Sequence, residues 1–363
     1  MNTTAAGPSD EQFFSPAEPV SPMLAKLVEK IPAADSVDGG LQYEPKWDGF
    51  RAILYWDGES LEIGSLGSKM LTRYFPELVE QIPPQLGEPC VLDGEIVVRQ
   101  GVPGGERLDW EALSQRIHPA ASRITKLSAE TPAAFVAFDL LALSGQSLLG
   151  APFADRRSAL ESLLADAKAP LHLTQYTRDA SVAERWLTQF EGAGLDGVVS
   201  KPLAAPYSPD KRTMFKTKHA RTADAVVLGY RIHKSGSGVG SLLLGLYDDE
   251  GELHNVGGAS AFTDKRRLEL VDELAPLVVT DESGAAVMGE TERSRFSGNK
   301  DVSFVRLEPT KVVEVKYDQM EGTRFRHAVQ FYRWRPDRAA RSCTYEQLER
   351  PLAYDLGEVL RGV

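Results

Sequence analysis

Residues 43–51 read YEPKWDGFR, which places a lysine, an acid, a glycine and an arginine in one turn between two apolar stretches. Strands on both sides would fix the stem of Lys46, while Pro45 and Gly49 would hold the loop open. A lysine fixed in this way can act as a nucleophile. A surface hairpin with a solvated lysine is the commoner alternative, since Lys-x-Asp-Gly-x-Arg arises by chance in roughly one chain in a few hundred of this size.

Two further lysines would assist an amine that attacks a nucleotide phosphate. The attacking amine must be uncharged, and nearby cations together with partial burial lower its proton affinity. Lys216 and Lys218 alternate on the expected strand 214–218, so both side chains would point the same way and hold a phosphate beside Lys46. The alternative is an exposed strand face with two solvated lysines.

Phosphoryl transfer also requires a divalent metal, and magnesium prefers a few carboxylates while it keeps several waters. Glu95 lies inside the apolar run 90–98, and Asp196 begins the expected strand 196–201. Buried without a partner, each acid would be costly, so each is either a metal ligand or a satisfied strand-end acid. Phe138 offers a surface on which a base could stack, although a lone phenylalanine in a strand is more often core.

The elements that must position these residues alternate between strands and helices, which predicts a mixed α/β first domain over residues 21–221. Residues 1–20 are polar and rich in Gly, Ser and Pro, and we expect them to form a disordered tail. Strands are expected at 90–98, 134–141, 196–201 and 214–218, and helices at 72–81, 109–118, 153–167 and 182–190.

The pattern changes at Thr222 to short strands separated by glycine-rich turns. One helix is expected at 264–274, with Thr263 as its N-cap. Short strands with one helix fit a five-stranded Greek-key barrel of the OB type over residues 222–363, a fold that commonly binds nucleic acid. The loop 233–240 is glycine-rich, but no helix start follows it, so we assign it no phosphate role. The expected strands are 225–232, 241–247, 253–257, 312–317 and 330–334.

Composition is that of an ordinary protein of two domains, with 363 residues, 42% hydrophobic and 26% charged. Cys90 and Cys343 lie far apart, which fits a reducing cytoplasm and neither a disulfide framework nor a four-cysteine zinc site. No apolar run is long enough to span a membrane, and no N-terminal signal is visible. The net charge of −11 argues only weakly against nucleic acid, because residues 321–341 contain six arginines against two acids.

Five stretches, in this order and with these gaps, resemble the serial motifs of the lysine-dependent nucleotidyltransferases: YEPKWDGFR, VLDGEIVV, VAFDLL, LDGVVSK and MFKTK. That superfamily contains ATP-dependent DNA ligases, RNA ligases and mRNA capping enzymes. With PMLA, TADAVVLGY and RWRPD added, the chain from Pro22 to Arg338 is most similar to compact bacterial ATP-dependent DNA ligases of the C type. The resemblance implies an α+β, two-domain nucleotidyltransferase, in which a mixed α/β adenylation domain precedes a C-terminal OB-fold barrel.

Carried over residue by residue, the resemblance makes Lys46 the nucleophile that becomes attached to AMP. It implies Mg²⁺ or Mn²⁺ as the metal and ATP as the nucleotide. The remaining members contact the nucleotide or the metal: Glu44 on adenine, Arg51 on ribose or the phosphate at the nick, Glu95 and Asp196 on ribose and metal, Phe138 stacked on adenine, Lys216 and Lys218 on the α-phosphate, Arg212 also on the cofactor, and Arg333 and Arg335 on pyrophosphate when the barrel closes.

The resemblance further implies a cycle of three displacements at phosphorus. AMP passes from ATP to Lys46 and then to a 5′-phosphate at a nick, before a 3′-hydroxyl expels it and seals the strand. Nicked duplex DNA and ATP are thus the expected partners, with repair proteins and no membrane. We expect a monomer in the cytoplasm, associated with the nucleoid and active in DNA repair.

Two departures from the family pattern affect the expected activity. Leu66 stands where family members have an arginine that contacts a nick phosphate, so nick binding would be weaker unless Lys69 substitutes. Asp196 replaces a commoner glutamate, so its carboxylate reaches one methylene less far. An RNA ligase or capping-type enzyme shares the lysine chemistry, and a catalytically weak DNA-end-binding protein is the alternative outside the enzymes. An NAD-dependent ligase is disfavoured because that family's four-cysteine zinc site is missing.

Overall fold

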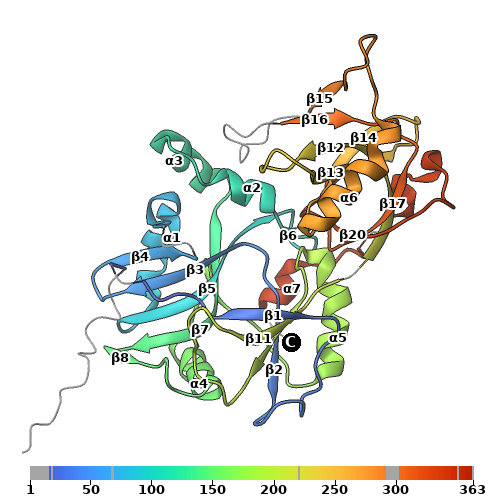
Figure 1. Cartoon of the computed structure of the whole chain (residues 1–363). Helices are drawn as coiled ribbons and strands as arrows, with labels where there is room; N and C mark the ends of the chain where they lie inside the picture. The colour runs from blue at the N-terminus through green and yellow to red at the C-terminus, as the bar shows by residue number, and fades with distance from the viewer. Residues whose placement is uncertain are drawn as a thin grey trace, which may run out of the picture. The chain divides into compact units, whose positions relative to one another are not determined.

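The computed structural model describes residues 16–17, 19–66, 69–219, 221–291, 302–349 and 351–361. It divides into two compact units: Met1–Lys218 with Pro351–Val363, and His219–Arg350 (Figure 1). The end of the chain therefore belongs to the first unit, which differs from the sequence-based expectation of a barrel that runs to residue 363. The reason is apolar burial, since Leu356 and Val359 join a core of the first unit. Most of the expected tail over residues 1–20 lies outside the described residues.

A seven-stranded sheet forms the first layer of this unit. Its main path runs in the order β4-β3-β5-β7-β8, with β6 paired to β5 and β9 paired in parallel to β7. Ala52 and Leu54 pack in one buried cluster and Ile53 and Tyr55 in another, as the alternation of side chains along a strand requires. The strands are β3 Phe50–Trp56, β4 Leu61–Ser65, β5 Cys90–Gln100, β6 Arg107–Leu108, β7 Ala133–Leu143, β8 Gln146–Ser147 and β9 Leu171–Leu173.

A second, four-stranded sheet has the order β1-β11-β10-β2. These strands are β1 Leu24–Val28, β2 Leu41–Pro45, β10 Val198–Pro202 and β11 Arg212–Thr217. β10 pairs antiparallel with both β2 and β11, whereas β1 pairs in parallel with β11. Segments from opposite ends of the unit's sequence thereby become neighbours, and the motif lysines of the two segments come to one sheet.

The helices of the first unit are short. The expected helix 72–81 is divided into η2 and α1, because Pro76 has no N–H to continue the first turn. Asp109 accepts a hydrogen bond from the Ala112 amide and so caps α2. The helices are η2 Thr72–Tyr74, α1 Pro76–Gln81, η3 Pro83–Gln85, α2 Trp110–Gln115, α3 Ala121–Glu130, α4 Phe153–Leu163, α5 Ala180–Gln189, η4 Phe190–Ala193 and α7 Leu356–Arg361.

The second unit is a curled β-sheet with one longer helix, α6 Asp264–Leu274, capped by Thr263 as predicted. One edge of β12 pairs with β13, and its other edge pairs with β17 and β16 in succession, which curls the sheet towards a barrel. The strands are β12 Arg221–Ile232, β13 Val239–Tyr247, β14 Leu253–Ala259, β15 Met288–Glu290, β16 Ser303–Arg306, β17 Val312–Tyr317, β18 Met320–Glu321, β19 Arg324–Phe325 and β20 Gln330–Trp334, and the 3₁₀ turns are η5 Ala275–Leu277, η6 Ala340–Ser342 and η7 Tyr345–Gln347.

The loop 233–240 leads from β12 into β13, and no helix begins at its end. Among the described residues, no helix has the length and apolar character needed to cross a membrane.

Candidate active site

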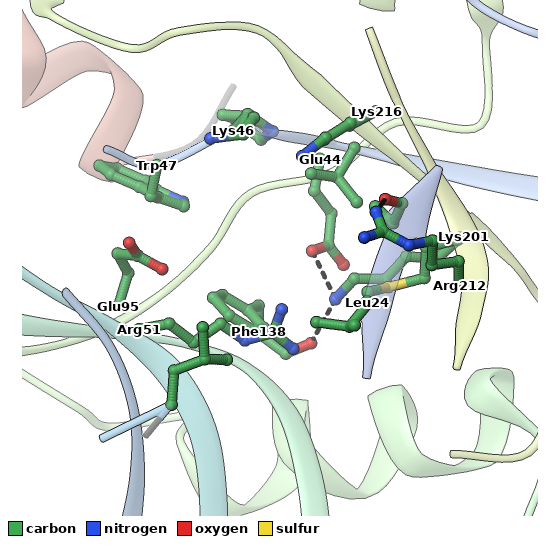
Figure 2. A pocket seen from close by; sticks show the side chains of 15 residues that line it. Leu24, Glu44, Lys46, Trp47, Arg51, Glu95, Phe138, Lys201, Arg212 and Lys216 are labelled. Carbon is green, nitrogen blue, oxygen red and sulfur yellow. Dashed lines mark hydrogen bonds and ion pairs between the residues drawn. The ribbon is translucent and has the colours of Figure 1, made fainter. Parts of the chain in front are cut away.

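A cavity of about 400 Å³ lies between the two sheets of the first unit (Figure 2). It is lined by seven of the residues singled out in the sequence: Glu44, Lys46, Arg51, Glu95, Phe138, Arg212 and Lys216. The other lining residues are Leu24, Ala25, Pro45, Trp47, Leu66, Val199, Lys201 and Met214. Residues up to 192 positions apart in the sequence (24 to 216) thus contribute to one pocket.

Lys46 follows the last residue of β2 and is fixed there by its backbone. Its amide donates to the Gly197 carbonyl at 2.8 Å, and its own carbonyl accepts from the Asp196 amide at 3.3 Å. The Lys46 Nζ lies 2.7 Å from Asp196 Oδ1, and the Lys218 Nζ lies 2.8 Å from Asp196 Oδ2. One buried carboxylate therefore holds both lysines. Lys46 must therefore separate from Asp196 before its amine can attack a phosphorus.

The motif requires a glycine at position 49 for a steric reason. A Cβ at this position would lie 2.1 Å from the Ile96 carbonyl oxygen, so only glycine allows the loop to approach β5 this closely. The same approach lets the Gly49 amide donate to Glu95 Oε1 at 3.1 Å. The lysine loop and the acid of β5 are consequently locked together by backbone geometry.

The pKa of the Glu95 carboxyl lies well above its ordinary value. Burial, with a smaller effect of the Asp196 carboxylate, raises the pKa of this carboxyl to about 7, although the Lys46 and Arg51 charges oppose the shift. A carboxyl in this environment takes up or releases a proton near neutral pH, and it gains most from an added cation.

Glu44 lies in β2, two residues before Lys46, and is almost completely buried. Its carboxylate accepts from Lys201 Nζ at 2.7 Å and from Gln42 Nε2 at 3.0 Å, and Arg157 lies 3.8 Å away. The β2–β10 register makes this possible, because it places Val199 opposite Glu44 and Lys201 opposite Gln42, so that Lys201 is the diagonal neighbour of Glu44.

Sequence reasoning did not identify Lys201, Gln42 or Arg157 as site residues. Lys201 ends the stretch LDGVVSK, whose pattern predicts only a strand. A signal was available, since a lysine on a buried strand must find an acid. The sequence alone does not show which acid pairs with Lys201, because that choice depends on the strand register.

Lys201 also connects Glu44 to Phe138. Its Nζ donates to the Phe138 carbonyl at 2.9 Å and lies 4.7 Å from the centre of the Phe138 ring. Arg51 lies over the same ring at 5.1 Å (Figure 2). Two fixed cations therefore lie close to the aromatic ring that lines the cavity.

Arg51 is oriented by a buried acid, Asp93, which the sequence motifs do not single out. Asp93 accepts two hydrogen bonds from the Arg51 guanidinium, at 2.9 and 2.6 Å, and a third from the Tyr207 hydroxyl at 2.7 Å. Burial alone would lower the pKa of Arg51, but the Asp93 carboxylate outweighs it and raises that pKa above its ordinary value. Arg51 is thus a permanent positive charge at the cavity wall.

β11 presents Arg212, Met214 and Lys216 to the cavity, which are alternate residues of one strand. Burial lowers the pKa of Lys216, and the neighbouring charges of Lys46 and Lys218 lower it further. Lys218 lies one residue beyond the end of β11 and reaches the site through Asp196. Both predicted lysines therefore lie at the site. Lys216 lines the cavity, and Lys218 pairs with the Asp196 carboxylate.

Leu66 lines the cavity and its side chain is 57% exposed. Gly67 and Ser68, the next residues of this departure from the family pattern, lie outside the described residues. Lys69, considered as a substitute for the missing arginine, is exposed and is not among the residues that line the cavity in the described part of the chain.

Arg333 and Arg335 belong to the barrel unit, where acids of the same unit hold them. The Arg333 Nε lies 2.6 Å from Glu314 Oε2. Arg335 pairs with Asp224 at 3.0 Å and with Asp337 at 2.9 Å. The hydrogen bond from Arg335 lowers the pKa of Asp337 to about 2. The local positive charge that the sequence predicted for residues 321–341 is consequently offset in part by nearby acids.

Comparisons with known proteins agree with this geometry. The family model of the ATP dependent DNA ligase domain matches residues 22–218, and that of the ATP dependent DNA ligase C terminal region matches residues 235–338. DNA ligase C2 of Mycolicibacterium smegmatis is 54% identical over 346 residues, which cover 92% of this chain and 95% of that protein. DNA ligase C of Mycobacterium tuberculosis is 52% identical over 360 residues, covering 95% and 98% of the two chains.

Solved structures are similar in fold. A structure from work on Lig E DNA ligases, described as binding DNA with a minimal scaffold, superposes with a TM-score of 0.54 at 18% sequence identity and covers 87% of this chain and 99% of its own. These findings confirm the predicted fold, a nucleotidyltransferase domain combined with an OB-type C-terminal domain.

Proposed function

Because this chain belongs to the family of ATP-dependent DNA ligases, we propose that it seals 5′-phosphate/3′-hydroxyl nicks in duplex DNA through a Lys46–AMP intermediate. Family membership supplies ATP as the nucleotide and DNA as the substrate class. The individual residue roles below are part of the proposal and are argued from the contacts of the site.

One observation carries the proposal: Lys46, Glu44 and Phe138 line the same cavity, whose volume of about 400 Å³ suits a nucleotide. Phe138 would stack on adenine, and the Glu44 carboxylate would accept from the adenine amino group. Lys201 supports both roles, since it holds the Glu44 carboxylate and the Phe138 carbonyl. The base would thus be fixed at one end of the cavity and the phosphates at the end where Lys46 lies.

The first step forms a bond between Lys46 Nζ and the α-phosphorus of ATP, while the bond from that phosphorus to the bridging oxygen breaks and pyrophosphate leaves. The amine must first lose a proton and separate from Asp196. Lys216, whose pKa is lowered, and Arg212 lie on the strand that borders this end of the cavity, where they would neutralise the phosphate charge. Arg333 and Arg335 would contact pyrophosphate when the barrel closes.

In the second step an oxygen of the DNA 5′-phosphate attacks the AMP phosphorus, and the bond to Lys46 Nζ breaks. In the third step the 3′-hydroxyl loses its proton and attacks the 5′-phosphorus of the DNA, so that AMP leaves and the strand is sealed. Arg51 would contact the ribose or the phosphate at the nick, for which Asp93 keeps its guanidinium oriented.

Glu95 and Asp196 fit a hard divalent cation, Mg²⁺ or Mn²⁺. Both offer carboxylate oxygens, the ligands that such ions prefer, and they lie close enough for the Asp196 charge to raise the pKa of Glu95. A cation would relieve that repulsion, and when bound it would neutralise charge on the phosphates. Lys46 and Lys218 compensate the Asp196 carboxylate in the structure described here.

The test is covalent labelling with ATP that carries a label on its α-phosphate, in the presence of Mg²⁺. The wild type should retain the label after denaturation, and Lys46→Ala should not. Lys211→Ala, at an exposed lysine of the same unit, is the matched control and should label like the wild type. Label that persists in Lys46→Ala would refute the nucleophile, and labelling without any sealing of nicked duplex DNA would refute the ligase function.

We further propose that the protein acts as a monomer in DNA repair, in the cytoplasm at the nucleoid and together with repair proteins. Support for a repair role comes from a relative that is 32% identical over 284 residues and is named a multifunctional non-homologous end joining protein of Mycolicibacterium smegmatis. This chain covers 34% of that relative, so the support concerns the ligase part. Light scattering of the purified protein at assay concentration tests the monomer.

A further inference from the structure

Residues 351–361, here called the C-terminal return, follow the barrel in sequence but belong to the first unit. They also lie beyond residue 338, where the match to the C-terminal family model ends. The barrel unit is consequently joined to the first unit by two covalent connections, one on each side of His219–Arg350. This segment therefore lies outside both family-model matches, and its position in the fold is explained by its own contacts.

The C-terminal return is bound to the first unit by specific contacts. The Glu106 amide donates to Asp355 Oδ1 at 2.9 Å, and the Leu356 amide donates to the Glu106 carbonyl at 2.8 Å. The Tyr354 ring packs on the Phe190 ring with 5.3 Å between their centres. The two hydrogen bonds to Glu106 fix the register of the segment as well as its position.

Gly192 shows how closely the segment approaches. A Cβ at Gly192 would lie 1.8 Å from the Leu352 carbonyl oxygen and 2.7 Å from the Tyr354 amide nitrogen. Both contacts are with backbone, which cannot swing away as a side chain can. The turn at Phe190–Ala193 thus accepts the C-terminal return only because this residue has no side chain.

The C-terminal return shares a buried apolar cluster with the residue that follows the nucleophile. Leu356 and Val359 are completely buried in the same apolar cluster as Trp47, which follows Lys46 in the chain. The Val359 carbonyl accepts from Gln175 Nε2 at 3.0 Å, and the preceding Thr174 hydroxyl accepts from Trp47 Nε1 at 2.8 Å. In Figure 2 the pale red ribbon of α7 lies on the Trp47 side of the cavity. Trp47 is thereby held by packing and through residues 174–175.

We propose that the C-terminal return is a positioning element for the first chemical step, which holds Trp47 and through it keeps Lys46 aligned with the nucleotide. The inference rests on the proposed function of Lys46. A reacting atom displaced by about 1 Å can cost about a hundredfold in rate, so a neighbour fixed in a buried cluster has a large effect on attack. The later transfer from DNA-adenylate to the 3′-hydroxyl does not use the Lys46 amine and should be much less sensitive.

Full-length variants separate this role from general stability. Leu356→Ala removes buried contacts of the return, and Gly192→Ala displaces it by collision without altering it. The matched control is Leu352→Ala, four residues from Leu356 in the same segment but 80% exposed. Two rates are measured for each: formation of labelled Lys46–AMP in a single turnover at saturating ATP, and sealing of a nick that already carries AMP.

We expect Leu356→Ala and Gly192→Ala to slow Lys46–AMP formation by about tenfold or more, with sealing of the adenylated nick within about twofold of wild type. Leu352→Ala should match the wild type in both. Equal losses in both rates, in step with a lowered melting temperature, would overturn the inference, and so would an unchanged first step. A wild type that forms no adduct would instead contradict the proposed function, so the two failures are distinguishable.

Discussion

Ion pairs occur both at the cavity and in the barrel, but in different surroundings. In the first unit the side chains of Lys201 and Glu44 are 4% and 3% exposed. In the barrel the side chain of Arg333 is 60% exposed, although it lies only 2.6 Å from Glu314. Pairing distance alone therefore does not distinguish a fixed site from an exchangeable one.

The difference indicates what each region can do with a nucleotide. A buried pair keeps one geometry, because separating its members leaves an uncompensated charge away from water. An exposed pair contributes little and can exchange its carboxylate for a phosphate at small cost. We infer that the first unit presents a preformed base site, whereas the exposed Arg333 of the barrel can change partners during the cycle. The predictions below test this contrast.

The largest effect is expected for Lys201→Met. It leaves the Glu44 carboxylate without its 2.7 Å partner, and breaking a buried pair costs about 3–5 kcal/mol in the free energy of unfolding. Lys46–AMP formation should fall by about a hundredfold or more, since Glu44 and Phe138 both lose their support. Denaturant unfolding and single-turnover labelling measure the two effects.

The control for this variant is the double change Glu44→Gln with Lys201→Met, which removes both charges. It should regain most of the lost stability, because no buried charge is left unpaired. A Lys201→Met protein as stable as the wild type would contradict the description of the base site as rigidly paired.

A smaller and more selective effect is expected for Arg335→Ala in the barrel. Loss of one charge-assisted contact to pyrophosphate should slow Lys46–AMP formation by about tenfold. Sealing of an adenylated nick, from which pyrophosphate is already gone, should not change. Arg341→Ala, at another arginine of the same basic segment, serves as the control. If Arg335→Ala slowed both steps equally, a pyrophosphate contact confined to the first step would be excluded.

The smallest effects are expected for a matched pair of acids, and they should have opposite signs. Burial raises the folded-state pKa of Glu95 to about 7. In contrast, Glu314 accepts a hydrogen bond from Arg333, which lowers the folded-state pKa of Glu314. The free energy of unfolding contributed by Glu95 thus falls as the pH rises from its unfolded pKa towards 7. The contribution of Glu314 is present above its unfolded pKa and is lost as the pH falls through its folded pKa.

Glu95→Gln should therefore melt at a higher temperature than the wild type at pH 8, with the difference gone near pH 4.5. Glu314→Gln should be less stable than the wild type at pH 8 by less than about 1 kcal/mol, again converging at low pH. Melting curves across this pH range measure both. Equal signs at pH 8 would remove the contrast between the cavity and the barrel.

Sequence patterns predicted the barrel strands 312–317 and 330–334 to the residue, because their alternation and flanking turns are local properties. They also selected seven residues that the fold brings to one cavity. They did not predict the break at Pro76 or the helix α3. Neither did they identify Lys201, Arg157 or Asp93 as part of the site, since each acts through a partner distant in sequence.

By itself, the sequence determined the chemistry: a lysine between strands, acids in apolar strands and an aromatic for a base are specified by residue type and spacing. Tertiary structure decided which charges meet, because an ion pair between Lys201 and Glu44 or a shared carboxylate between Lys46 and Lys218 depends on strand register. It also decided that α7 joins the buried apolar cluster that contains Trp47. Burial of apolar surface selects such contacts over the whole fold, and no local stretch of sequence contains that information.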